Sequence, residues 1–312
     1  MNEFELIEQL TRDLARNQAV VVGAGDDCAV LDLGLPDQLL LFKTDAVVEG
    51  VHFLAQTEAE KVGHKALARA LSDIAAMAGR PVAAVVTLGL PAGFDAERVQ
   101  RIYAGMNATA RRYGVAIAGG ETTTTPHTLL LSVALMGTVE RTRCILRSGA
   151  RPGQAIFVTG ALGGSLGGRH LEFEPRLEEG HWLAANFPIS AMIDLSDGLA
   201  GDLRHLLRAS GVGAELLAEA IPISREAKAR ARSHPSNKSP LMAALTDGED
   251  FELLFTLPSG HAVSLLDAWK KRFPDVGLTC IGKTTAGREL CLRDRQGCRP
   301  LGVHGYVHFQ QS

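Results

Sequence analysis

The sequence has few aromatic residues, few cysteines and no long hydrophobic run. Phe, Trp and Tyr make up 5% of the 312 residues, and 32 Lys and Arg nearly balance 35 Asp and Glu. The longest apolar run, over 129–139, contains Ser132 and is far shorter than the roughly 20 residues of a membrane-spanning helix. The N-terminus is acidic and amphipathic, unlike a signal peptide. These absences predict a cytoplasmic protein that neither enters a membrane nor binds nucleic acid through a basic surface.

The five cysteines are scattered, and no two of them form a C-x-x-C pair. This usage excludes a disulfide framework and a zinc site of the usual spacing, and it fits a reducing compartment. Glycine is abundant by contrast, with 33 residues, many of them beside acidic residues. A glycine next to a carboxylate predicts a backbone that comes close to a charged ligand.

Short β-like runs alternate with amphipathic segments along the whole chain, which predicts a mixed α/β (α+β) fold. We expect helices at residues 3–16, 57–77, 95–113, 198–209 (opened by Asp197) and 259–272. We expect strands at residues 19–23, 28–33, 38–45, 82–90, 115–118, 128–139, 155–160, 191–195, 251–258, 278–282 and 290–293. The polar segment 230–240 is predicted to be a loop. The turn-rich segment 147–154 predicts two domains, 1–146 and 147–312.

Residues 277–284, GLTCIGKT, match the P-loop pattern G-x-x-x-x-G-K-[ST]. A true P-loop follows a strand and opens a helix, so that helix amides face the phosphates. Here the strand-like residues lie inside the pattern, and Ala286-Gly287 breaks any following helix. We therefore expect no P-loop at this position.

Acidic residues recur in six separate tight turns, most of them at the end of an apolar strand. They are Asp27, Asp45, Asp73, Glu121, Asp194 and Asp197. A single such residue is more often a turn former or a helix cap, but strand ends are also where α/β folds bind ligands. Converging carboxylates without Cys or His indicate Mg²⁺. Because metal-assisted phosphoryl transfer needs no protein nucleophile, the pattern favours a Mg²⁺-dependent enzyme that handles phosphates.

Eight motifs in this order identify a family: GDDCAV, TDAVVEGVHF, SDIAAMAG, GGETT, RSGARPG, IDLSDGLAGDL, GEDFELLF and GYVHF. Together they resemble thiamine-monophosphate kinase, within the PurM-like group of ATP-dependent enzymes related to aminoimidazole ribonucleotide synthetase. The resemblance covers nearly the whole chain. It implies a two-domain PurM-like fold with a C-terminal α/β domain, and a homodimer in which the N-terminal domains pair into a barrel. It also implies phosphorylation of thiamine monophosphate by ATP through direct in-line transfer, without a covalent nucleophile.

The resemblance also implies roles for individual residues. The residues that match magnesium ligands are Asp27, Thr44, Asp45, Asp73, Asp194 and Asp197, with Lys43 and Glu121 at aligned positions. The residues that match positions around ATP are Tyr103, Gly120, Glu121, Arg147 and Ser196. The residues that match positions facing thiamine monophosphate are His52, Glu249 and Tyr306.

Two of these positions depart from the family pattern. Glu121 stands where Asp is usual, and Lys43 stands where a small hydroxyl residue is usual. The Lys43 ammonium cannot be a metal ligand, so it either replaces one cation or turns to solvent. Two other functions therefore stay open: a same-fold ATP-dependent enzyme with another acceptor, and a catalytically impaired nucleotide-binding paralogue. The tail contains no cysteine, which argues against relatives that use a C-terminal thiol.

Overall fold

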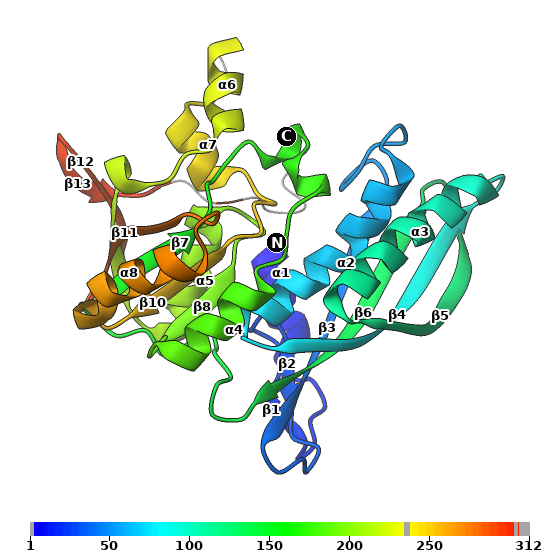
Figure 1. Ribbon diagram of the computed structural model, residues 1–312, viewed down its shortest axis with the longest axis horizontal. Helices are drawn as coiled ribbons and strands as arrows, with labels where there is room; N and C mark the ends of the chain where they lie inside the picture. The colour runs from blue at the N-terminus through cyan, green and yellow to red at the C-terminus, as the bar shows by residue number, and fades with distance from the viewer. Residues whose placement is uncertain (1–2, 234–237, 303–304, 306–312) are drawn as a thin grey trace.

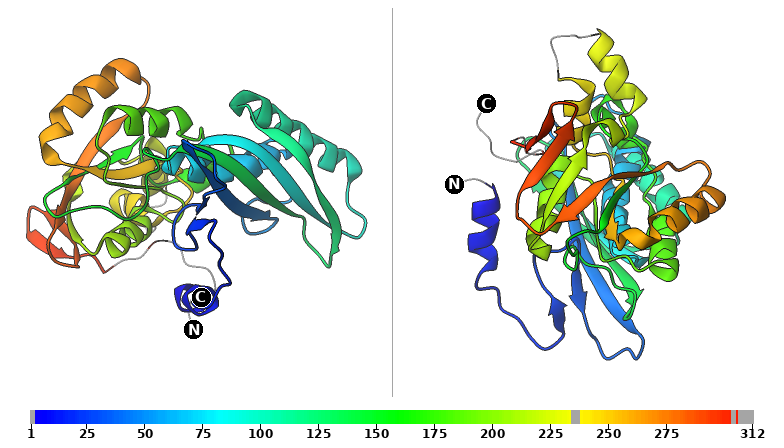
Figure 2. Two further views of the ribbon diagram at one scale, coloured as in Figure 1. Left: turned by 90° about the horizontal axis from the view of Figure 1, so that it is seen from below. Right: turned by 90° about the vertical axis from the view of Figure 1, so that its left-hand side faces the viewer.

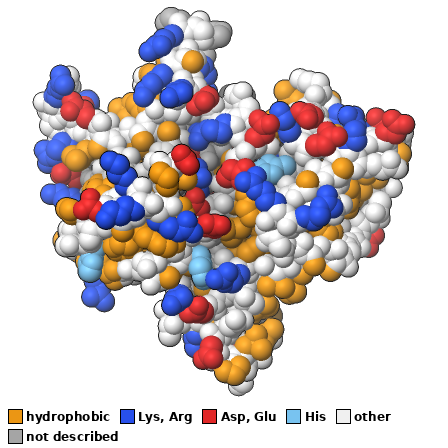
Figure 3. Space-filling view, in the orientation of Figure 1, with side chains coloured by type: hydrophobic (Ala, Val, Ile, Leu, Met, Phe, Trp, Pro, Cys, Tyr) orange, Lys and Arg blue, Asp and Glu red, His pale blue; other side chains and the backbone are white. Residues whose placement is uncertain are grey.

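The computed structural model describes residues 3–233, 238–302 and 305, so the predicted substrate residue Tyr306 lies outside the described part of the chain. Two sheets divide the molecule into an N-terminal and a C-terminal half that lie side by side (Figure 1). This mixed α/β architecture confirms the predicted fold class. No helix within the described residues is long and apolar enough to cross a membrane. On the face shown in Figure 3, acidic and basic side chains are intermixed over both halves.

The N-terminal sheet has six strands in the order β1-β2-β3-β6-β4-β5. Its strands are β1 Val20–Val22, β2 Ala29–Leu31, β3 Gln38–Val48, β4 Arg80–Pro91, β5 Ala116–Thr125 and β6 Leu130–Glu140. Only the β4–β5 pair is parallel among the pairs of this sheet, and β5 forms an exposed edge. Helices α2 (Ala59–Ala76) and α3 (Ala96–Tyr113) cover one face of the sheet (Figure 1).

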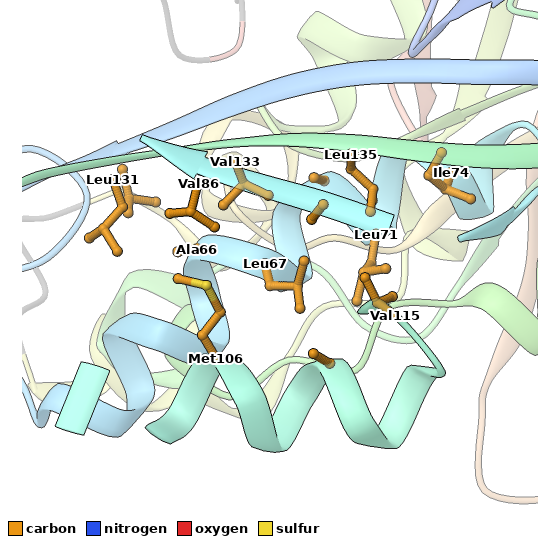
Figure 4. Close-up of a cluster of buried hydrophobic side chains, with 14 of the residues drawn as sticks. Ala66, Leu67, Leu71, Ile74, Val86, Met106, Val115, Leu131, Val133 and Leu135 are labelled. Atoms are coloured by element: carbon orange, nitrogen blue, oxygen red, sulfur yellow. The ribbon is translucent and has the colours of Figure 1, made fainter. Parts of the chain in front are cut away.

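Helix α2 is the central element of the N-terminal core. Leu67, Leu71 and Ile74 of α2 are fully buried; Leu67 and Leu71 lie beneath Val133 and Leu135 of β6, and Ile74 lies beside Leu135 (Figure 4). Helices α2 and α3 approach closely because glycines face each other: a Cβ at position 63 would lie 1.8 Å from the carbonyl oxygen of Ile102. The C-terminal end of α2 also packs into the other half, where Ala75 and Ala76 join the core around α4 (Leu177–Asn186). Helix α2 therefore crosses the boundary between the halves.

The C-terminal sheet has seven strands in the order β13-β12-β9-β11-β7-β10-β8. Its strands are β7 Ala155–Thr159, β8 Ala191–Asp194, β9 Gly213–Leu217, β10 Leu253–Leu257, β11 Leu278–Thr285, β12 Leu290–Asp294 and β13 Gly297–Pro300. Helices α5 (Leu199–Ser210) and α7 (Pro240–Thr246) pack on one face, and α4 and α8 (Ala262–Arg272) pack on the other. Strands β7, β8 and β10 are consequently buried along their whole length.

Several predicted boundaries are wrong, and each has a local cause. The first helix, α1 (Glu3–Thr11), ends five residues early; it stands apart from both sheets (Figure 2), and Leu14 beyond it is half exposed, so packing does not extend it. Residue Gly198, not Asp197, is the N-cap of α5, and it makes no side-chain cap hydrogen bond. Strand β5 continues to Thr125 because it pairs with β4 over its whole length.

The predicted loop 230–240 is wrong in part. Helix α6 (Arg225–Ser233) extends into it, and α7 begins at Pro240, where Ser239 caps the amide of Met242 at 3.2 Å. The expectation that 277–284 is no P-loop is confirmed. Residues 278–285 form β11, which is paired with β7 on one side and β9 on the other.

Candidate active site

Three of the predicted metal ligands converge where the two halves meet. Within the described chain, the group of acidic side chains close enough to share a metal ion consists of Asp27, Asp73 and Asp194, with one oxygen of each within 4.8 Å of the others. Asp27 precedes β2, Asp73 lies in the last turn of α2, and Asp194 ends β8. All three are buried. We call these three residues the acidic group.

Each member of the acidic group has a different fixed partner. The Arg147 guanidinium donates to Asp27 Oδ1 at 2.6 Å, and Lys43 Nζ donates to Asp73 Oδ1 at 2.8 Å. The hydroxyl of Ser72 donates to Asp194 Oδ2 at 2.6 Å. Burial and the charge of Asp27 raise the pKa of Asp194 to about 7. The group is therefore crowded with negative charge that its partners only partly offset.

The donor set of the acidic group fits a magnesium ion. Oxygen Oδ2 of Asp27 is buried and has no hydrogen-bond partner among the described residues. A buried carboxylate oxygen without a partner is costly unless something that the protein binds satisfies it. Three carboxylates without nitrogen or sulfur ligands are typical of a hard divalent cation such as Mg²⁺.

Strand β3 sends its predicted ligands to opposite faces of the N-terminal sheet. Asp45 lies beside the acidic group, with Oδ2 3.8 Å from Lys43 Nζ. Because side chains alternate along a strand, Thr44 lies on the outer face, where its hydroxyl is 3.3 Å from that of Ser132. Glu121 is exposed on the edge strand β5, opposite Thr87, which in turn pairs with Ser132, so it shares this outer face. The structure thus does not bring Thr44 or Glu121 to the acidic group.

The turn that follows β8 carries two further predicted residues. The amide of Asp197 donates to the buried carboxylate of Asp202 at 3.0 Å, and the carbonyl of Ser196 accepts from the amide of Glu249 at 2.7 Å. A Cβ at Gly305 would lie 2.3 Å from the Asp197 carbonyl oxygen, so the end of the described chain passes over the same turn. The predicted ATP residue Ser196 therefore meets the predicted substrate residue Glu249 through the backbone.

The remaining predicted ATP residues lie in different parts of the structure. Arg147 lies on the acidic group, and its amide also donates to Asp26 at 3.1 Å. Tyr103 is half buried on α3, against the N-terminal core. Gly120 lies on β5, where a Cβ would come 1.9 Å from the carbonyl oxygen of Val86. Arg147 is thus the predicted ATP side chain that contacts the acidic group.

A fully buried lysine, Lys65 of α2, joins the two described residues that are predicted to face the substrate. Its Nζ donates to the carbonyl of His52 and to Glu249 Oε2, each at 2.7 Å, and lies 2.6 Å from His170 Nδ1. His170 belongs to the short helix η2 (Arg169–Leu171). Glu249 has a φ of 64°, unusual for a residue with a side chain and typical of positions constrained by function. The substrate residues are thus held across the boundary of the halves.

Helix α2 carries a row of charged residues, of which the sequence analysis predicts Asp73 but neither Lys65 nor Arg69. Lys65, Arg69 and Asp73 are four residues apart and therefore lie on one side of the helix. Ion pairs connect them with three acidic and basic residues of other elements, and the signs alternate. The order is Lys65, Glu249, Arg69, Asp45, Lys43 and Asp73. We call these six residues the charge row; charged residues at four-residue spacing in an alanine-rich helix were the available signal for it.

The charge row keeps Glu249 ionised. Burial alone would raise the pKa of Glu249, but the hydrogen bond from His170 and the charges of Lys65 and Arg69 lower it to about 2. The pKa of Lys65 is lowered to about 8, because burial outweighs the attraction of Glu249. The predicted substrate side therefore presents a carboxylate whose charge is balanced by α2.

Comparison with known proteins agrees with this geometry. Residues 25–139 match the N-terminal domain of AIR synthase related proteins, and residues 151–293 match the C-terminal domain. The chain is 41% identical to thiamine-monophosphate kinase of Rhodopirellula baltica, over 92% of each chain. It is 35% identical to that of Bacillus subtilis, over 99% of this chain and 100% of the relative.

A solved structure resembles the whole molecule. It is AaThiL complexed with AMPPCP and TMP, with a TM-score of 0.82 and 31% identity, and the match covers 99% of this chain and 97% of that one. Both domain matches, the full-length relatives and the convergence of Asp27, Asp73 and Asp194 lead to one assignment. The chain belongs to the thiamine-monophosphate kinase family of AIR synthase related proteins.

Proposed function

We propose that this protein transfers the γ-phosphoryl group of ATP to thiamine monophosphate, yielding thiamine diphosphate. The observation that carries the proposal is the acidic group, assembled from both halves beside Arg147 and connected by the charge row to Glu249. The Rhodopirellula baltica and Bacillus subtilis relatives are thiamine-monophosphate kinases, and the AaThiL structure contains TMP and AMPPCP, which supports the proposal.

The chain's own residues would act mainly by positioning. Mg²⁺ held by Asp27, Asp73 and Asp194 would neutralise the charge of the phosphate oxygens. Arg147 is suited to an ATP phosphate because its guanidinium presents paired donors, and its backbone is fixed by Asp26. Phosphoryl transfer by in-line attack needs no protein nucleophile, which fits a site composed of carboxylates and cations.

The remaining site assignments are part of the same proposal. Further metal positions are Asp45, Asp197, Thr44 and Glu121, with Lys43 at an aligned position as a cation. The ATP positions are Tyr103, Gly120, Glu121, Arg147 and Ser196, and the substrate positions are His52, Glu249 and Tyr306. For Thr44, Tyr103, Gly120, Glu121 and Tyr306 the support is the family resemblance alone.

We also propose a cytoplasmic homodimer with domains 1–146 and 147–312. The division is supported by the two sheets, since β6 ends at Glu140 and β7 begins at Ala155. Dimer formation is supported by apolar side chains on the outer face of the N-terminal sheet. Phe42, Val82, Val85 and Met136 are 39–46% exposed there. An exposed patch of this kind marks an interaction site in many proteins. All five cysteines are free, which suits the cytoplasm.

One assay tests the activity. Purified protein is incubated with ATP, Mg²⁺ and thiamine monophosphate, and thiamine diphosphate is measured. We expect product that depends on all three components. ADP release without thiamine diphosphate would favour another acceptor, and ATP binding without turnover would favour an impaired paralogue; either result would overturn the proposal.

A further inference from the structure

Arg69 lies at the centre of the charge row, one helical turn from Lys65 and one from Asp73. Its side chain is 16% exposed, and its guanidinium lies 5.9 Å from the centre of the Phe251 ring. No sequence motif assigns a role to this arginine. Its position, between the predicted substrate residue Glu249 and the predicted metal residue Asp45, distinguishes it from the other cations at the site.

The hydrogen-bonding capacity of Arg69 is poorly used. Its Nη1 is 3.4 Å from Glu249 Oε1, its Nη2 is 3.7 Å from Asp45 Oδ1, and its buried Nε has no partner among the described residues. The neighbouring cations are held much more tightly, Lys65 at 2.7 Å from Glu249 and Lys43 at 2.8 Å from Asp73. A guanidinium with five donors and only loose contacts can take another anion.

The location of Arg69 indicates which anion. A substrate with an organic part at Glu249 and a phosphate that must reach the acidic group has to pass its phosphate by Asp45 and Arg69. The approach of a dianionic phosphate to the carboxylates of Glu249 and Asp45 is unfavourable unless a cation lies between them, and Arg69 lies there. Arginine binds phosphate through two parallel hydrogen bonds, which fix its orientation as well as its place.

We propose that Arg69 binds the phosphate of thiamine monophosphate and orients it for attack; this inference rests on the proposed function. The guanidinium contacts the oxygens that do not react. The remaining oxygen forms the bond to the γ-phosphorus, while the bond from that phosphorus to the β–γ bridging oxygen breaks and ADP leaves with the electron pair. Arg69 thus exchanges two loose contacts for charge-assisted hydrogen bonds.

The test compares two ligands that differ by the phosphate. Binding of thiamine monophosphate and of thiamine is measured calorimetrically, with Mg²⁺ and AMPPCP present, for the parent, Arg69→Gln and Arg69→Lys. We expect Arg69→Gln to weaken binding of thiamine monophosphate at least tenfold and that of thiamine less than twofold, with Arg69→Lys between parent and Gln. Equal weakening of both ligands, or none, would overturn the inference. Lys61→Gln is the matched control, because Lys61 lies in the first turn of α2, is partly exposed and pairs with Glu58 and Glu172 instead of Glu249 or Asp45.

A double-mutant cycle separates direct contact from an effect through Glu249. In a Glu249→Gln background, Arg69→Gln should still weaken binding of thiamine monophosphate about tenfold and raise its KM while the KM for ATP stays unchanged. Loss of the Arg69 effect in that background would show that Arg69 acts only on Glu249. A parent protein that makes no thiamine diphosphate refutes the proposed function itself, whereas normal binding by Arg69→Gln in an active enzyme refutes only this inference.

Discussion

At the scale of single residues, Lys43 departs most clearly from the family pattern, and its side chain points inward. It is 23% exposed and lies between Asp73 and Asp45, so the alternative that it turns to solvent is wrong. Burial alone would lower its pKa, but the two carboxylates raise it above the usual value. Lys43 is therefore a permanent cation beside the acidic group, at a place where a divalent cation could otherwise bind.

We predict that Lys43→Ser increases the number of divalent cations bound per chain by one and raises the Mg²⁺ concentration needed for half-maximal rate. A serine hydroxyl can be a ligand, and the lost ammonium leaves two carboxylates to be neutralised. Bound Mn²⁺ is counted by electron paramagnetic resonance, with Lys43→Met as the control that removes the charge without supplying a ligand. The same Mn²⁺ count in parent and Lys43→Ser would show that Lys43 replaces no cation.

Glu249 makes the free energy of unfolding depend on pH in the acid range, between pH 4.5 and about 2. Its pKa is about 2 in the folded state, below the ordinary value of 4.5, because Lys65, Arg69 and His170 face it. Such a group contributes stability that is fully present above pH 4.5 and is lost as the pH falls toward 2. We predict that the free energy of unfolding declines less steeply between pH 4.5 and 2 in Glu249→Gln than in the parent. Denaturant titrations at a series of pH values measure this difference, and parallel curves would contradict it.

At the scale of secondary-structure elements, α2 both supports the core and carries the charge row. Its apolar residues pack against β4 and β6 (Figure 4). Lys65, Arg69 and Asp73 of the same helix instead form ion pairs with Glu249, Asp45 and Lys43. Fully buried Lys65 is tolerated because its ammonium donates to the carbonyl of His52 in the N-terminal half and to the carboxylate of Glu249 in the C-terminal half. The helix therefore belongs to the core of the N-terminal half and also holds Glu249 of the C-terminal half in place.

We predict that Lys65→Met destabilises the protein by about 3–5 kcal/mol, because it leaves the largely buried carboxylate of Glu249, 15% exposed, without its closest cation. Chemical unfolding gives the value. Lys61→Met, four residues earlier on the same helix, removes two exposed or partly exposed ion pairs, with Glu58 and Glu172, and should cost at most about 1 kcal/mol. Adding Glu249→Gln to Lys65→Met should recover part of the loss. Equal costs for the two lysine variants would argue against a special role for Lys65.

At the scale of the whole molecule, the site exists only when the halves are docked, since Asp27 and Asp73 come from one and Asp194 from the other. The outer face of the N-terminal sheet, opposite the site, exposes several apolar side chains. Phe42 pairs with Met136 across β3 and β6, and Val85 lies on neighbouring β4, so these exposed side chains adjoin one another. Two copies could bury this patch together, which is how symmetric dimers form.

We predict that the protein is a dimer in solution and that Val85→Glu shifts it toward monomer. A carboxylate in the middle of an apolar interface would have to be buried without a partner. Light scattering coupled to size-exclusion chromatography measures the mass. Val263→Glu, on α8 of the C-terminal half and 71% exposed, is the control and should remain dimeric. A monomeric parent would show that no dimer forms. A dimeric Val85→Glu would show that the dimer interface lies elsewhere.

The amino-acid sequence by itself determined most of the kinds of elements and the family, and it predicted a magnesium-dependent chemistry for the site. Helical periodicity predicted α2 and α3 to within a few residues, and carboxylates without cysteine or histidine indicated magnesium. Errors occurred where local signals were weak: α1 ends early and 230–240 is partly helical, because the extent of these segments depends on contacts rather than periodicity.

Only the tertiary structure decided which predicted residues meet. Asp27, Asp73 and Asp194 converge, whereas Thr44 and Glu121 face away, since the register of the sheet assigns each side chain to a face. The positions of Lys65 and Arg69 become informative only through their contacts with Glu249, which is 184 and 180 positions away in the chain. A local pattern reports a residue's chemical type and its face, but its partners depend on the packing of distant segments, and in this protein that packing places a row of alternating charges along α2.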